Sequence, residues 1–346
     1  MAHIFIQPRG LPSGARLSTG DGAALIYDGD PGIDDALAIL LALRAIGAGL
    51  RAITCVAGNV PVPKSFRNAA KLIELSKRDG IAHEPEIGIG SAKPLRAPLR
   101  TSEHIHGSDG LGETQDLFPG FDPRPYLAKA REGVGLIADI LSREPGPVKI
   151  VAAGPLTNIA KLITRYPTAA ARVGELVIMG GVFEGEGNAS PVAEYNVYSD
   201  PHAARAVFAS GLPIRLLPLE VTRRAVVRRE HLNALRGSGS MASEFAIRAL
   251  EYYIRAHGDR LGKEEGYLHD PLAMAIAIDD SLVLEEELWR VEVEVKGEIT
   301  TGQTVAYRGP WGVEGNRIRV VREVDIGRFS RAFFMALKGP PARAHP

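Results

Sequence analysis

The 346-residue sequence has little cysteine, no excess of charge and no long apolar run, and each lack excludes a class of protein. Cys55 is the only cysteine, which excludes an internal disulfide and a zinc site built from several thiolates. Basic and acidic residues number 41 each, so the chain lacks the basic excess of nucleic-acid-binding proteins, and we expect no nucleic-acid partner.

The ends of the chain and its apolar stretches predict a cytoplasmic protein. The N-terminus has no charged segment followed by an apolar one, which is the pattern of a secretory signal. The longest apolar stretches, such as residues 36–43, are too short to span a bilayer, so no membrane partner is expected. We predict a loose extension over residues 1–22, one domain over 23–338 and a flexible tail over 339–346.

Short β-rich runs alternate with helical runs, which predicts an α/β fold with an open, mainly parallel, Rossmann-like sheet flanked by helices. The predicted strands are 23–27, 50–57, 86–89, 148–152, 175–179 and 214–217, and the predicted helices are 33–44, 64–77, 156–165 and 201–210. The last third predicts a small antiparallel elaboration, with strands at 289–296 and 317–321 among helices at 240–257, 269–278 and 328–337. In such sheets ligands bind beyond the carboxyl ends of the strands.

The stretch DGDPGIDD places four aspartates directly after the first predicted strand: Asp28, Asp30, Asp34 and Asp35. A helix N-terminus stabilises one or two carboxylates there but does not explain four. A bound divalent cation explains the rest, because hard cations take carboxylate oxygens as ligands. The lack of a cysteine cluster favours Ca²⁺ or Mg²⁺ over zinc.

Further polar side chains follow other predicted strands. Asn59 comes after the second strand, in VAGNV, where a turn residue that caps its own backbone is the simpler interpretation. The loop after the fifth strand carries Asn188, Glu194 and Asn196, and amides together with a carboxylate suit a polyhydroxylated ligand such as a sugar.

Two histidines stand in distinctive contexts. His269 and Asp270 come directly before an apolar helix, where Asp270 could be a simple N-cap. Next to a metal site that lacks ligands, Asp270 becomes a candidate ligand and His269 a titratable group beside it. His106 lies in the glycine-rich stretch EHIHGSDGLG, and a structural role is the alternative for it.

These motifs together resemble the inosine–uridine-preferring nucleoside hydrolases. DGDPGIDDALAI, VAGNV, HGSDGLG, GPLTNIA, MGG…GNASPVAEYNVYSDP and HDPLA occur in the order of that family and cover about residues 24–337. The resemblance implies a nucleoside hydrolase fold, the use of Ca²⁺, and hydrolysis of ribonucleosides to free base and ribose. It also implies a homodimer or homotetramer, and retention of the HDPLA histidine hints at a broad or inosine- and uridine-type preference.

The resemblance assigns metal ligands residue by residue. It implies that Asp30 binds Ca²⁺ and acts as general base toward the attacking water. Asp35 and Asp270 resemble further ligands, and the backbone carbonyl of Ala153 resembles another. Family members often have threonine at position 153, but a carbonyl ligand does not depend on the side chain. Asp28 is left with a supporting role around the turn.

The same resemblance assigns the sugar and base contacts. Asp34 resembles the residue that grips the ribose 2′-hydroxyl, and Asn59 and Asp270 resemble further ribose contacts. Asn188 and Glu194 resemble contacts on the 5′-hydroxyl side, and Asn196 resembles the contact with the sugar near the reacting centre. His269 resembles the residue that protonates the departing base, and His106 resembles a residue near the base pocket.

Two other functions fit parts of the pattern. A Mg²⁺-dependent phosphohydrolase with an aspartate nucleophile also carries DxD after a strand, but it needs a lysine and further acids at later strand ends. A non-catalytic nucleoside- or ribose-binding protein could use the same scaffold, although Asp30 and His269 argue against it. Analysis of the products separates the first from a nucleosidase, and binding without turnover would support the second.

Overall fold

The computed structural model describes residues 17–18, 22–308 and 315–339, so the predicted extension and tail lie mostly outside the described residues. The strands of its main sheet are β1 (Ala24–Gly29), β2 (Leu50–Cys55), β3 (Glu86–Ile89), β4 (Arg131–Glu132), β5 (Val148–Ala152), β6 (Val173–Met179), β7 (Ile214–Leu217), β10 (Val283–Val293), β11 (Thr304–Tyr307) and β12 (Ile318–Val324). Within the described part, these ten strands are ordered β11-β10-β12-β7-β6-β5-β1-β2-β3-β4.

All neighbouring strands from β4 across to β12 are parallel. Among the described residues of this main sheet, only the pairs of β10 with β12 and β11 are antiparallel. The predicted mainly parallel sheet with an antiparallel C-terminal part is therefore confirmed. The strand predicted at 289–296 was too short at its start, because β10 begins at Val283. Its first half is the acidic, mostly exposed run 284–288, which lacks the alternation of apolar and polar residues that marks the second half.

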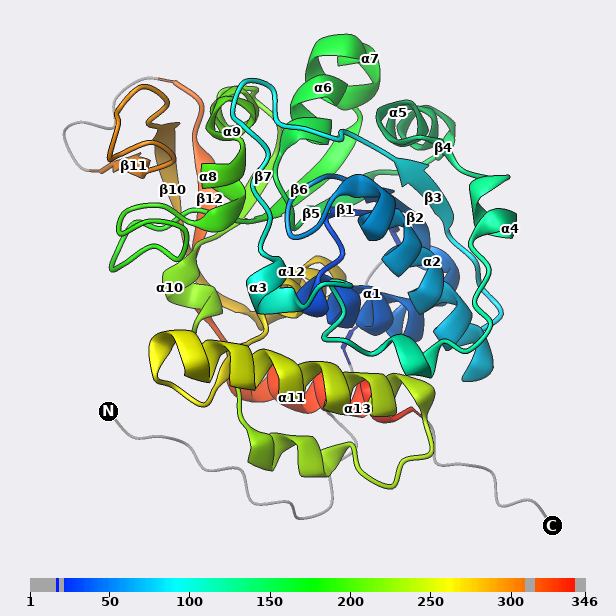
Figure 1. The fold of residues 1–346 in the computed structure, drawn as a ribbon. Helices are drawn as coiled ribbons and strands as arrows, with labels where there is room; N and C mark the ends of the chain where they lie inside the picture. Colours follow the sequence, from blue (N-terminus) through cyan, green and yellow to red (C-terminus); the bar gives the residue numbers. More distant parts are fainter. Residues whose placement is uncertain (1–16, 19–21, 309–314, 340–346) are drawn as a thin grey trace.

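Helices cover both faces of the sheet (Figure 1). One face carries α1 (Ile33–Ala45), α2 (Val62–Arg78) and α12 (His269–Ile278), with α11 (Met241–Leu261) and α13 (Ile326–Lys338) outside them. The other face carries α5 (Gly133–Arg143), α6 (Thr157–Arg165), α7 (Pro167–Ala170) and α9 (Pro201–Phe208). Successive residues of β1 enter the two cores in turn, since side chains alternate along a strand.

Shorter elements connect these layers: α3 (Glu103–His106), α4 (Arg124–Leu127), α8 (Tyr195–Ser199), α10 (Leu219–Thr222), β8 (Val226–Val227) and β9 (Gly266–Tyr267). The sequence did not predict α5, β4 or β11. Strand β4 has two residues, which is too short for a periodic pattern to show. No helix within the described ranges combines the length and apolar character needed to cross a bilayer.

Helix α1 explains where the aspartates lie. Its residues from Ile33 to Leu43 are all buried, because the helix is apolar around its whole circumference and packs against α12, α2 and α13. Strand β1 lies between β2 and β5 in the sheet, so its carboxyl end opens at the point where connections diverge to either side. The acidic turn between β1 and α1 is therefore held inside the protein at this edge.

Candidate active site

The aspartates of the turn are buried at the carboxyl end of β1 and in the first turn of α1. Asp28, Asp30, Asp34 and Asp35 are each at most 7% exposed. Burial of several like charges is unfavourable unless each is neutralised, hydrogen-bonded or paired with a cation. Their hydrogen bonds therefore show which of them the protein itself satisfies.

Asp35 is the most fully hydrogen-bonded of these carboxylates. Its Oδ1 accepts from the Tyr27 hydroxyl at 2.7 Å and from the backbone N–H of Asp30 at 3.2 Å. Its Oδ2 accepts from the backbone N–H of Gly32 and from Asn59 Nδ2, each at 3.0 Å. This carboxylate is thereby fixed in orientation, with all of its donors on the turn or on the ends of β1 and β2.

Three carboxylates from two helices meet at this point. Asp34, Asp35 and Asp270 each place one oxygen within 4.8 Å of the others. Burial and the neighbouring Asp35 raise the pKa of Asp34 to about 8, and burial with the charges of Asp34 and Asp35 raises the pKa of Asp270 well above its usual range. Without a compensating positive charge, burial and mutual repulsion favour the protonated form of these carboxyl groups.

Two carboxylate oxygens of the acidic turn and the first turn of α1 are left without donors. Asp30 Oδ1 and Asp34 Oδ1 are buried and have no hydrogen-bond partner among the described residues. An unpartnered buried carboxylate oxygen is costly, and a cation is the ligand that compensates it. The residues present therefore fit a bound metal ion, as the sequence predicted.

Glycines allow the backbone to approach these carboxylates. A Cβ at Gly58 would lie 1.9 Å from Asp30 Oδ2, and one at Gly154 would lie 2.6 Å from Asp30 Oδ1. The Asn59 backbone N–H also donates to Asp30 Oδ2. The loops after β2 and β5 thus enclose Asp30 from two sides, which explains the glycines of VAGNV and AAGPLTN.

The predicted backbone ligand lies beside a predicted sugar contact. Asn196 Nδ2 donates to the carbonyl oxygen of Ala153 at 3.1 Å and to that of Met179 at 3.2 Å. A carbonyl oxygen has two lone pairs, so Ala153 keeps one for a cation. Of the predicted ligands, Asp35 and Asp270 lie in the close trio. The third member of the trio is Asp34, which the resemblance assigned to the sugar. Asp30 is outside the trio but linked to it, because its backbone N–H donates to Asp35 Oδ1.

The segment after β6 brings its predicted residues together. Glu194 is 1% exposed and caps α8, accepting hydrogen bonds from the N–H groups of Asn196 at 2.8 Å, Val197 at 3.1 Å and Gly181 at 3.1 Å. Burial raises its pKa to about 7 in spite of these donors. Asn188 Oδ1 accepts from the N–H of Tyr195 at 2.8 Å, which ties the segment back on itself.

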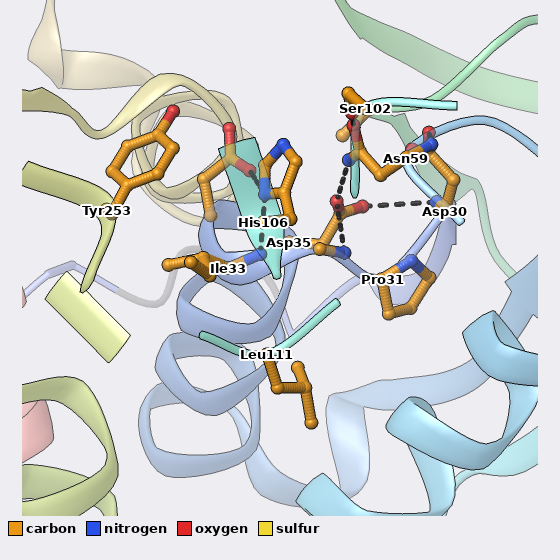
Figure 2. Close-up of polar contacts among 12 residues, drawn as sticks. Asp30, Pro31, Ile33, Asp35, Asn59, Ser102, His106, Leu111 and Tyr253 are labelled. Carbon is orange, nitrogen blue, oxygen red and sulfur yellow. Dashed lines mark hydrogen bonds and ion pairs between the residues drawn. The ribbon is translucent and has the colours of Figure 1, made fainter. Parts of the chain in front are cut away.

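Asn59 is held by two side chains, one of which the sequence did not single out. Its Oδ1 accepts from the Ser102 hydroxyl at 2.6 Å while its Nδ2 donates to Asp35, as Figure 2 shows. One amide hydrogen remains for a ligand. Ser102 and Tyr27 were both missed, because a loop serine and an aromatic residue inside a strand carry no pattern that distinguishes them from solvated and core residues.

His106 lies against the start of α1 (Figure 2). Its Nδ1 accepts from the N–H of Ile33 at 3.0 Å, which leaves the ring proton on Nε2. The same Nδ1 is 3.9 Å from Asp34 Oδ1, and the ring centroid is 5.7 Å from that of Tyr253. Burial lowers the pKa of His106 to about 3, so the ring is neutral.

His269 is buried in a similar way at the start of α12. Its Nδ1 lies 2.8 Å from the Thr222 hydroxyl, and burial lowers its pKa to about 3. Ring contacts connect the two site histidines through Tyr253, His257 and Tyr267, with successive centroid separations of 5.7, 4.3, 5.8 and 5.5 Å. A wall of this kind can pack against a planar ring.

Asp28 takes its hydrogen bonds from side chains outside the trio. Its Oδ1 accepts from the Thr54 hydroxyl at 2.5 Å and from Asn158 Nδ2 at 2.8 Å. Asn158 also donates to the Cys55 carbonyl at 3.2 Å and accepts from the Ser91 N–H at 2.8 Å. These bonds join the ends of β1 and β2 to α6, and they give Asp28 a supporting position.

Fold and site together define an α/β protein with a buried carboxylate cluster, flanked by amides and neutral imidazoles, beyond the carboxyl ends of its strands. The sequence model of the inosine-uridine preferring nucleoside hydrolase family matches residues 25–331, and the chain belongs to this family. It is a nucleoside hydrolase. The family and the enzyme class predicted from the sequence are therefore confirmed.

Named relatives and solved structures agree with this membership. The chain is 37% identical to the pyrimidine-specific ribonucleoside hydrolase RihA of Salmonella arizonae over 305 residues, 88% of this chain and 94% of that protein. The plant nucleoside hydrolase PpNRh1 superposes with a TM-score of 0.82 at 31% identity, covering 92% of this chain and all of that one. The purine-preferring ribonucleoside hydrolase from Gardnerella vaginalis gives 0.81 at 29% identity, covering 91% and 98%.

Proposed function

We propose that this protein hydrolyses the N-glycosidic bond of ribonucleosides, giving free base and ribose, and that it requires Ca²⁺. The observation that carries the proposal is the buried trio of Asp34, Asp35 and Asp270 with the neighbouring Asp30, beside amides and two neutral histidines. One oxygen of Asp34 and one of Asp30 have no hydrogen-bond partner among the described residues. Carboxylates and amides suit the hydroxyl groups of a sugar, and a divalent cation suits the excess of negative charge.

The donor set favours a hard cation. Asp30, Asp35 and Asp270 would hold the ion through carboxylate oxygens, and Ala153 through its carbonyl oxygen. All of these donors are oxygens, which suits Ca²⁺ better than zinc or copper. When bound, the ion would supply positive charge that orients a water molecule and lowers its pKa.

Asp30 is the residue that would take the proton from the attacking water. Its Oδ2 is occupied by the Asn59 N–H, whereas its Oδ1 has no partner among the described residues. Burial and the charge of Asp35 raise its pKa well above the usual range, which makes it a stronger proton acceptor than an exposed aspartate.

The sugar would be held by groups from four segments of the chain: the start of α1, the loop after β2, the segment after β6, and the start of α12. Asp34 binds the 2′-hydroxyl, Asn59 and Asp270 bind further ribose oxygens, and Asn196 lies near the reacting carbon. Bond cleavage in glycosidases passes through an oxocarbenium-like transition state, and the surrounding carboxylates and amide oxygens would stabilise its positive charge. Asn188 and Glu194 would bind the 5′-hydroxyl side.

The departing base would be neutralised by His269, with His106 on the wall of the base pocket. Burial keeps His269 neutral in the free protein. Negative charge that develops on the base raises the proton affinity of the neighbouring ring, so His269 takes up a proton from solvent and passes it to the base as the bond breaks. The Thr222 hydroxyl, 2.8 Å from Nδ1, fixes the ring for this transfer.

The test is release of base from a panel of purine and pyrimidine ribosides, including uridine, inosine and nitrophenyl riboside. We expect free base and ribose to form, the activity to be lost after dialysis against a chelator, and Ca²⁺ to restore it. Nitrophenyl phosphate, the control for a phosphohydrolase, should release no phosphate. Absence of base release across the panel at saturating Ca²⁺ would overturn the proposal.

A further inference from the structure

The segment that carries Asn188, Glu194 and Asn196 contacts the antiparallel C-terminal part of the sheet. Ala193 forms an isolated β-bridge with Gln303, the residue before β11. Glu184 in the same segment pairs with Arg308 at 2.9 Å and with Arg322 of β12 at 2.8 Å. The residues that resemble sugar contacts are thus supported by strands from the last part of the chain.

The most specific of these contacts is made by the Thr304 side chain, which is 4% exposed. Its hydroxyl accepts from the N–H of Val182 at 3.0 Å and donates to the carbonyl oxygen of Val182 at 2.6 Å. One hydroxyl therefore satisfies both backbone polar groups of one buried residue. Removal of the hydroxyl would leave a donor and an acceptor without partners.

The residue before Val182 is adapted to this contact. Gly181 has φ +77°, and a Cβ on it would lie 3.0 Å from Thr304 Cγ2. Both the backbone conformation and the close approach require glycine here. The N–H of Gly181 donates to Glu194 Oε2 at 3.1 Å. The hydroxyl of Thr304 and the carboxylate of Glu194 are therefore joined through two adjacent residues.

Glu194 is in turn the cap of α8, whose first turn carries Asn196. Its Oε1 accepts from the N–H of Asn196, and its Oε2 accepts from the N–H groups of both Val197 and Gly181. The position of this carboxylate thus depends on the two ends of the segment being held at a fixed separation. Thr304 fixes the first of these ends.

We propose that Thr304 is a positioning residue for the sugar site: its hydroxyl holds Gly181 and Val182 so that Glu194 is placed to bind the 5′ side of the nucleoside. This inference rests on the proposed function, which assigns Glu194 to that side. It gives the antiparallel strands a part in substrate recognition in addition to their part in the fold.

The test compares Thr304→Val, which keeps the shape and removes the hydroxyl, with Thr304→Ser, which keeps the hydroxyl. Thr164→Val in α6 removes a hydroxyl that bonds only within its own helix and serves as a remote control. Each variant is assayed on uridine and on 5′-deoxyuridine, which lacks the group that Glu194 would bind. Thermal melts confirm that each variant is folded at the assay temperature.

We expect Thr304→Val to lose roughly tenfold in kcat/KM on uridine and at most about twofold on 5′-deoxyuridine, since one hydrogen-bond network is removed. Thr304→Ser and Thr164→Val should keep the wild-type ratio between the two substrates. Equal losses on both substrates, or the same loss in Thr304→Ser, would overturn the positioning role.

The inference can fail separately from the proposed function. If the wild-type protein releases no base from either nucleoside, the proposed function fails. Calorimetric binding of D-ribose and 5-deoxyribose then gives the same comparison without turnover. Under the inference, Thr304→Val weakens D-ribose binding and leaves 5-deoxyribose binding unchanged, and equal effects on the two sugars would contradict it.

Discussion

The side-chain amide of Asn68 donates a hydrogen bond to the carbonyl oxygen of Pro31 at 3.0 Å. The same nitrogen donates to the carbonyl oxygen of Asp109 at 2.9 Å. Pro31 lies in the acidic turn, and Asp109 lies in the glycine-rich loop that follows His106. One buried amide on α2 therefore connects two loops of the site that are far apart in the sequence.

We expect Asn68→Ala to destabilise the protein by about 2 kcal/mol, because two buried carbonyl oxygens lose their donor. It should also lower kcat/KM, since the turn and the His106 loop lose their common support. Urea unfolding and uridine hydrolysis measure the two effects. Ser76→Ala on the same helix is the matched control, because the buried Ser76 hydroxyl has no partner among the described residues. Equal stability of the two variants would contradict this role.

Asp30→Asn should leave a folded protein whose turnover falls by about 10²–10⁴-fold, the range for loss of a general base. The amide oxygen of asparagine can still accept the hydrogen bond from the Asn59 N–H, so we expect the local structure to be retained. Asp28→Asn is the control, since its hydrogen bonds come from Thr54 and Asn158 and not from the carboxylate trio. Turnover near that of the wild type in Asp30→Asn would remove Asp30 from the catalytic role.

His269→Ala should reduce hydrolysis of inosine more than hydrolysis of nitrophenyl riboside. The nitrophenolate leaves without a proton, whereas a purine base needs one, so only inosine hydrolysis depends on a proton donor. The ratio of kcat values on the two substrates measures the effect. Thr222→Val, which removes the hydroxyl 2.8 Å from Nδ1, should shift the ratio in the same direction by a smaller factor. Equal losses on both substrates would count against the acid role.

Local patterns predicted most of the fold and the positions from which the site is built. Helix α1 is apolar on every side, and Asp34 and Asp35 follow a short strand, so both the buried helix and its acidic start could be predicted from spacing. The antiparallel end of the sheet followed from the alternation in the second half of β10. Parallel topology then placed the strand ends at one edge.

Contacts that depend on tertiary structure could not be predicted. Tyr27 reads as a core aromatic inside a strand, yet its hydroxyl donates to Asp35. Ser102, Thr222 and Thr304 lie in stretches with no periodic or motif signal, because a single hydroxyl gains its role only from the backbone group that folding brings to it. The membership of Asp34 in the carboxylate trio likewise depends on the approach of α12, which the sequence order does not specify.

Glu194 should make the stability of the protein depend on pH. Burial raises its pKa in the folded protein to about 7, against an ordinary value of 4.5. Because the pKa is raised in the folded state, the contribution of Glu194 to the free energy of unfolding is fully present below about pH 4.5. That contribution is lost as pH rises through 7. By this linkage, the loss is at most about 3 kcal/mol between pH 4.5 and pH 8.

Glu194→Gln removes this titratable group, so the difference in stability between wild type and variant isolates its contribution to the pH dependence. The glutamine amide would turn its NH₂ group toward one of the backbone donors of Gly181, Asn196 and Val197, which costs stability at every pH. The variant should therefore be clearly less stable than the wild type at pH 5, and the difference should narrow as pH rises to 8. Urea unfolding across this range measures the difference. A difference that stays constant with pH would show that the Glu194 carboxylate is already ionised at pH 5, with its three N–H donors outweighing the effect of burial.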